Sequence, residues 1–180
     1  MTLNEFESEL TEQDIRPIKK ITIILTLGVV LMASLGMYLY FFKATTKDPN
    51  YNNSLMNTYL IVLFVLFVAT VFGSKIVSQT TLKGENGLGS TDAKRNLLDK
   101  TRLIGIFNTQ HIIRVAMLEG SAFFGCVVYL LSVLGNQIYA TSYNWLSLIP
   151  AVFVIFHNLS FMPTKEKVVR VLKTAQAELN

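Results

Sequence analysis

The chain has 180 residues, of which 51% are hydrophobic and 16% are charged, and its formal net charge is +4. A soluble domain of this length usually carries about 25% charged residues, so the composition excludes an ordinary soluble domain. A single cysteine, Cys126, excludes an internal disulfide and a paired-cysteine metal motif, and its apolar surroundings predict that it packs as a small hydrophobic residue.

Residues 1–20 are polar and rich in glutamate. A cleavable signal peptide would begin with basic residues and become apolar within a few positions, which this segment does not do. We therefore expect residues 1–20 to form a cytoplasmic N-terminal tail, and the first apolar stretch to remain in the membrane as an anchor.

Four apolar stretches follow, and each has the length of a membrane span. About 20 residues of helix, rising 1.5 Å per residue, cross about 30 Å of hydrocarbon, and in lipid the backbone must satisfy its own hydrogen bonds. The sequence predicts an all-α membrane protein, a bundle of four transmembrane helices within residues 21–162 that is built from two helical hairpins. The predicted spans are residues 21–42, 55–77, 115–134 and 143–162.

Lysines and arginines alternate between the two sides of the predicted bundle. Thirteen of the 16 lie in the N-terminal tail, in the loop of residues 78–114 or in the C-terminal tail, and Lys75 lies at the end of the second span next to that loop, whereas only Lys43 and Lys47 lie in the first loop. The positive-inside rule then places both termini and the loop 78–114 in the cytoplasm. The excess of basic over acidic residues, 16 against 12, favours contact with anionic lipid head groups, and it requires no nucleic-acid partner. Tyr143 and Trp145 flank the outer end of the last span, where we expect them to anchor at head-group level.

The cytoplasmic loop 78–114 opens with a glycine-rich turn at residues 83–89 that matches neither the dinucleotide-binding nor the P-loop pattern. Ser90 or Thr91 is a candidate N-cap for a helical pattern that leads towards the third span. That segment is either an interfacial helix or a cytoplasmic extension of the span, and Gly105 is a candidate break.

Residues 163–180 predict a short amphipathic helix in a cytoplasmic tail. Thr164 is a candidate N-cap, and Val168, Val169 and Leu172 fall on one face with lysines opposite. The helix either lies on the inner membrane surface or docks onto the loop 78–114.

Small residues predict where helices pack in lipid, because they permit close approach. The third span is the richest in them, so we expect it to be central, and the bulky second span to be the most exposed to lipid. The candidate packing residues are Gly28, Gly36, Gly73, Ala116, Gly120 and Gly125.

Glu119 is the only acidic residue within a predicted span, and an ionisable group in hydrocarbon is by default a functional candidate. His157 falls in the same cytoplasmic third of the bilayer, which predicts a hydrogen bond or ion pair with Glu119. Asn158 and Ser121 are candidates to join this network. The alternatives are a structural polar network that sets helix register, a proton or ion site, and a contact to a lipid head group or small ligand.

His111 and Arg114 lie three residues apart at the predicted inner interface, where Arg114 is expected to reach lipid phosphate. No catalytic residue is proposed, because no nucleophile and base arrangement is evident. The two histidines lie at different depths and no CxxC motif occurs, so we expect neither a metal site nor a cofactor.

Two stretches carry a family resemblance, QHIIRVAMLEGSAFFG at residues 110–125 and PTKEK at residues 163–167. Together they resemble small, functionally uncharacterised bacterial inner-membrane proteins with four spans, which implies a multi-pass protein of the bacterial inner membrane and implies no activity. The Glu119 segment is also faintly similar to the carboxylate helix of ATP synthase rotor subunits. Leu27 stands where the first hairpin of such a rotor would need an acid, so a rotor role is not expected.

Two functions from different classes fit these features, and an enzyme within the membrane is a third alternative. The first is a non-catalytic accessory or scaffolding subunit of a larger membrane complex, favoured by the lack of a catalytic constellation. The alternative is a small proton- or ion-coupled transporter or channel that uses Glu119, for which four spans suffice only in an oligomer.

The charge distribution makes a prediction about topology. A cysteine introduced at Asn53 or Gln137 should react with an impermeant thiol reagent added outside the cell, and one introduced at Asn86 should not. The reverse labelling pattern would overturn the positive-inside argument.

Overall fold

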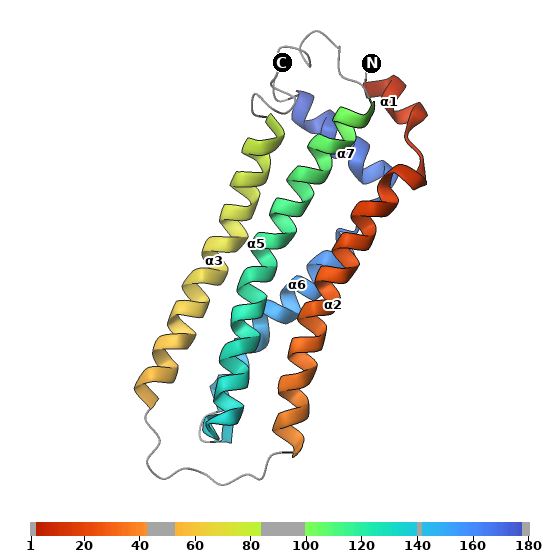
Figure 1. Ribbon diagram of the computed structural model, residues 1–180. Coiled ribbons are helices and arrows are strands. Elements are labelled where there is room, and N and C mark those ends of the chain that lie inside the picture. Colours follow the sequence, from red (N-terminus) through yellow and green to blue (C-terminus); the bar gives the residue numbers. More distant parts are fainter. Residues whose placement is uncertain (1–2, 43–52, 84–99, 140–141, 178–180) are drawn as a thin grey trace. The chain divides into compact units, whose positions relative to one another are not determined.

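Helices make up nearly all of the chain that the structure describes (Figure 1). The computed structural model describes residues 3–42, 53–83, 100–139 and 142–177, and no strand occurs among them. Their contacts divide the chain into two compact units. Unit 1 comprises residues 1–23, 73–116 and 161–180, and unit 2 comprises residues 24–72 and 117–160.

Three helices are long and apolar enough to cross a membrane: α2 (Glu12–Phe42), α3 (Asn53–Lys83) and α5 (Lys100–Leu134). The number rises to four if Tyr143–Ser160 and Lys165–Ala177, which are separated by a short break, are counted as one broken span. This set of helices indicates a membrane protein.

The helices extend beyond the predicted spans. In particular, α5 runs from Lys100 to Leu134 without interruption, so residues 100–114 are an extension of the third span and Gly105 does not break it. The extension is helical because Leu103, Ile106 and Phe107 are buried on one face. The predicted caps at Ser90 or Thr91 and most of the glycine-rich turn lie outside the described residues.

The last apolar stretch differs from the predicted continuous α-helix. A 3-10 helix, η2 (Ser142–Leu148), leads directly into α6 (Ile149–Ser160). Pro150 therefore occupies the first turn of α6, where its missing N–H costs no hydrogen bond, and it does not kink a longer helix. At about 2.0 Å per residue in η2 and 1.5 Å in α6, the two together are about 32 Å long.

A tight turn at residues 135–136 follows α5. Asn136 adopts a left-handed conformation with φ 58°, which asparagine tolerates and which ends α5. A short 3-10 helix, η1 (Gln137–Tyr139), follows, and the Asn144 amide donates to the Gln137 carbonyl at 2.9 Å. Trp145, expected as an interface anchor, is half-buried and packs with the ring of Tyr129, 5.2 Å between centroids.

Unit 1 has its own apolar core, to which the N-terminal segment contributes. The segment predicted as a tail contains α1 (Leu3–Glu9) and the first turns of α2, and these pack with the start of α5 and with α7 (Lys165–Ala177). The buried residues of this core are Phe6, Leu10, Ile15, Ile18, Leu103, Ile106, Phe107, Val168, Val169, Leu172 and Ala175.

Local hydrogen bonds explain where α2 begins. Thr11 is the N-cap, and Asp14 reaches back to the Thr11 backbone N–H at 2.8 Å, while Leu10 and Ile15 are buried on either side as a hydrophobic staple. Asp14 also pairs with Lys100 of α5 at 2.6 Å. The hydrogen bond from Lys100, with those from Thr11, lowers the pKa of Asp14, which precedes the apolar part of α2, to about 2. Asp14 is therefore charged at neutral pH and couples the cap to α5.

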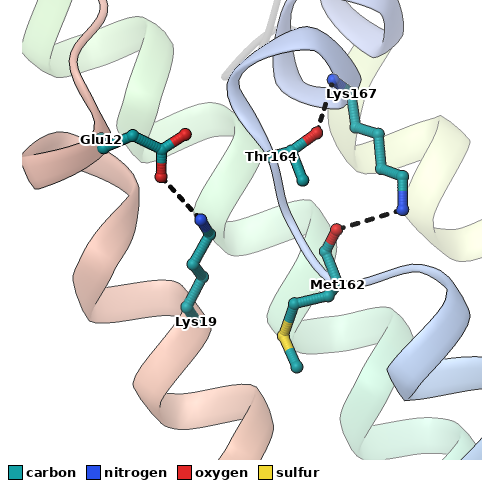
Figure 2. Close-up of polar contacts among 5 residues, drawn as sticks. All are labelled: Glu12, Lys19, Met162, Thr164 and Lys167. Atoms are coloured by element: carbon teal, nitrogen blue, oxygen red, sulfur yellow. Dashed lines mark hydrogen bonds and ion pairs between the residues drawn. The ribbon is translucent and has the colours of Figure 1, made fainter.

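The start of α7 is capped in the predicted way. The Lys167 backbone N–H donates to the Thr164 hydroxyl at 3.4 Å, and the Lys167 ammonium folds back to the Met162 carbonyl at 3.3 Å (Figure 2). The apolar face of α7, including Val168 and Leu172, is buried in the core of unit 1. This burial agrees with docking onto residues 100–107 and disagrees with an apolar face laid on the membrane surface.

Unit 2 is centred on α5. Of the most apolar 18-residue stretch of each long helix, 56% is buried in α5, 22% in α2 and 11% in α3. The third span is thus the central one and the second the most exposed, as the small residues predict. Cys126 is 1% exposed and packs as expected among apolar side chains, with Val29, Leu118, Ala151 and Val154 in the same cluster.

Three of the candidate glycines allow this close packing. A Cβ at Gly28 would lie 3.2 Å from the Phe123 ring, and one at Gly36 would lie 2.7 Å from the Tyr129 ring. A Cβ at Gly125 would collide with the Ser147 carbonyl of η2.

The remaining candidates behave differently. Gly120 is exposed and a Cβ there would meet nothing within 4 Å, and Ala116 is also exposed, so neither residue makes the helix contact expected of it. Both lie on the face of α5 opposite the buried Leu118 and Ala122. Gly73 is half-buried.

Gly120 and Gly125 of α5 provide a matched pair of variants. Gly125→Ala should lower stability by about 1–3 kcal/mol, because backbone atoms cannot move aside cheaply. Gly120→Ala should be neutral or stabilise by up to about 1 kcal/mol, through helix propensity alone. The measurement is the melting temperature of each variant in mild detergent, and equal changes in both would contradict the contact at Gly125.

Candidate functional site

Glu119 is the only Asp, Glu, Lys or Arg among the described residues of unit 2. It is 3% exposed, because α5 places it beside Leu118 and Ala122 on the face that packs against the other helices. A buried carboxyl group without hydrogen-bond donors is strongly unfavourable, so its partners decide whether unit 2 tolerates it.

The side-chain amide of Asn158 supplies the partner. Its Nδ2 atom donates to the Glu119 carboxyl at 3.3 Å and to the Thr26 hydroxyl at 3.0 Å. Asn158 is 2% exposed and Thr26 is 8% exposed. One amide group thus connects α6 to both α5 and α2, with its two hydrogens assigned to two different helices.

The structure places Asn158, rather than His157, next to Glu119. Successive residues of a helix point about 100° apart, and the buried face of α6 is the one that carries Ala151, Val154 and Asn158. His157 is half-buried, stacks on Phe153 with 5.9 Å between ring centroids, and has Nδ1 3.5 Å from Asn158 Oδ1.

We call the cluster of Thr26, Glu119 and Asn158 the Asn158 network. Ser121 was expected to belong to it and does not, whereas Thr26 belongs to it without having been expected. The Ser121 hydroxyl donates to the Leu118 carbonyl of its own helix at 2.8 Å and not to the network. Thr26 was not anticipated from the sequence. The available signal was a hydroxyl in an apolar span, which is uninformative alone because such hydroxyls commonly bond to their own backbone.

His111 belongs to unit 1 and connects α5 to α2. Its Nε2 lies 3.0 Å from the Thr22 hydroxyl, which itself donates to the Ile18 carbonyl at 2.9 Å. The imidazole also stacks on Phe107 at 5.8 Å between centroids. These contacts give His111 a structural role.

Arg114 also lies in unit 1, with its guanidinium 5.5 Å from the centroid of the Phe161 ring. The Lys167 ammonium lies 5.9 Å from the same centroid. Phe161 is 53% exposed, so these cations surround an accessible aromatic side chain. Sequence reasoning identified Arg114 and missed Phe161, because the ring comes from a segment 47 residues further along the chain.

The arrangement limits the chemistry. The Asn158 network holds one carboxyl group among neutral hydrogen-bonding groups, which suits setting helix register or holding a proton, and it contains no activated nucleophile. Among the described residues, no three His, Cys, Asp or Glu side chains are grouped so that they could hold a metal ion.

The Asn158 network predicts an order of variant effects. Glu119→Gln should be milder than Glu119→Leu, because glutamine still accepts from Asn158, whereas leucine leaves a buried amide hydrogen without its acceptor, at a cost of about 1–3 kcal/mol. Expression and melting temperature in detergent measure the difference. Equal losses in the two variants would show that the hydrogen bond does not stabilise the fold.

No protein-family model, curated protein or solved structure matches this chain. The resemblance to small bacterial inner-membrane proteins therefore stays a prediction from the sequence, and function has to be argued from the described residues.

Proposed function

We propose that the chain is a non-catalytic accessory or scaffolding subunit of a larger complex in the bacterial inner membrane. In this proposal α2, α3, α5 and the η2–α6 stretch are four spans, unit 2 is the membrane part, and unit 1 is a docking platform in the cytoplasm. The core of unit 1 is the observation that carries the proposal.

The division of charge supports this topology. Of the 16 lysines and arginines, 14 belong to unit 1, and the two in unit 2, Lys43 and Lys47, lie outside the described residues. The units are defined by contacts and not by charge, so their agreement with the charge distribution supports placing the segments of unit 1 on one side of the membrane, which the positive-inside rule makes the cytoplasm.

The described residues of unit 1 form a packed core with ion pairs between helices, which loops that only connect spans would not need. Ion pairs at 2.6 Å join different helices, Glu7 of α1 to Lys173 of α7 and Asp14 of α2 to Lys100 of α5. Each partly exposed pair contributes at most about 1 kcal/mol, so the buried core provides most of the stability. Arg16, Lys20 and Arg170 remain exposed on this unit, which suits docking of an acidic protein surface.

The alternative function is a small proton- or ion-coupled transporter or channel that uses Glu119. It is favoured by the isolation of this carboxyl in unit 2 and by its neutral partners. Transport needs access from water, however, and Glu119 is 3% exposed. This burial favours the structural role of the Asn158 network and makes transport the second candidate.

The test is purification from the native membrane in mild detergent, followed by mass spectrometry of the proteins that remain attached. We expect a stoichiometric partner, and we expect Arg170→Glu to release it by reversing a charge on the exposed surface of α7 without changing the melting temperature. Lys47→Glu makes the same charge change on the proposed outer side and should retain the partner.

A chain that purifies alone, or a partner that all three proteins retain equally, would contradict the docking platform. Proton flux in proteoliposomes that is lost in a folded Glu119→Gln variant would establish the alternative function instead.

A further inference from the structure

An apolar groove of about 600 Å³ lies within unit 2, between α3 and the η2–α6 stretch. None of its lining residues is charged, and several are exposed by more than half, among them Ile61, Phe64 and Val65. The lining residues are Asn57, Leu60, Ile61, Leu63, Phe64, Val65, Phe67, Tyr143, Leu146, Ile149 and Pro150.

The 3-10 geometry of η2 gives the groove one of its walls. A 3-10 helix has three residues per turn, so side chains three apart stand in a straight row. Tyr143 and Leu146 of η2 have this spacing, which Ile149 continues as the first residue of α6, and all three line the groove. A continuous α-helix would rotate each of these side chains further around the axis and would not present such a row.

The length and polarity of the groove match one leaflet of a bilayer. The wall from Asn57 to Phe67 covers about 15 Å of α3, half of a hydrocarbon core of about 30 Å. At one end the Tyr143 hydroxyl donates to Asn57 Oδ1 at 2.8 Å. At the other end Phe67 meets Phe153 edge to face, with 5.3 Å between ring centroids. The groove is therefore polar at its head-group end and enclosed by aromatic rings at depth.

A transmembrane helix suits this groove poorly. Helices approach closely in lipid through small residues, and no glycine, alanine or serine lines the groove. A flexible hydrocarbon chain follows bulky, irregular walls without needing close approach of backbones.

We propose that this groove binds a single acyl chain of a membrane lipid, with the lipid ester and head group beside Asn57 and Tyr143. The chain lies along Leu60, Phe64 and Leu146, and ends against the Phe67–Phe153 ring pair. The Asn57 amide N–H groups point to an ester or phosphate oxygen as acceptor, since its carbonyl oxygen is already held by Tyr143. The site depends neither on the sidedness of the chain nor on the accessory role proposed above.

The experiment uses the full chain reconstituted in vesicles of phosphatidylethanolamine and phosphatidylglycerol, extracted again in mild detergent and examined by native mass spectrometry. We expect the wild-type protein to retain one lipid per chain. Val65→Trp should lose this lipid, because an indole placed at a 62% exposed position fills the groove from its open side.

Val68→Trp is the matched control, because Val68 lies one turn further along α3, is 38% exposed and does not line the groove. It should retain the lipid, and both variants should keep the wild-type melting temperature. Equal retention or equal loss in the two variants would overturn the proposal. A dimer that Val65→Trp dissociates would also overturn it, and would make a second copy of the chain the occupant.

Discussion

The two hydrogen bonds donated by the Asn158 amide decide how the helices of unit 2 are held together. Lipid tails are as apolar as leucine, so apolar side chains add little to helix association, and register has to come from polar groups and close packing. Gly28 brings α2 against α5, and Gly125 brings the start of the last stretch against α5. Only with the three helices this close can one amide reach both Thr26 and Glu119.

Unit 1 is stabilised by a different balance of forces. Its residues such as Phe6 and Leu172 are fully buried, and burial of this kind is strongly favourable only where the alternative is water. Capping and charge pairing, as at Asp14 and Lys100, also act at helix ends that meet water. In the proposed topology unit 1 therefore folds in contact with water and unit 2 in contact with lipid, and this division follows the distribution of lysine and arginine.

The sequence predicts those features that depend on one segment at a time. Span length identifies α2, α3 and α5, and the face of Val168 and Leu172 identifies α7. Prediction from the sequence fails where contacting residues are distant in the chain, or where the rotation of a helix about its axis decides which side chains face inward. The segment with Phe6 is ordered by α5 and α7, and no short-range pattern reveals that contact. Glu119 stands out by its charge alone, but its hydrogen-bond donor is Asn158 and not the neighbouring His157, because depth alone cannot decide which face of α6 turns inward.

The 3-10 geometry of η2 could not be predicted from length and composition, and it affects the packing on two sides of the last apolar stretch. The largely apolar segment of residues 142–160 is compatible by length and composition with one continuous α-helix. In the structure the first seven of these residues form the narrower 3-10 helix, which places the Ser147 carbonyl against Gly125 on one side. On the other side it aligns Tyr143, Leu146 and Ile149 facing α3. The contact that packs this stretch onto α5 thus goes with a groove between the same stretch and α3, and the groove is one reason why α3 is the least buried of the long helices.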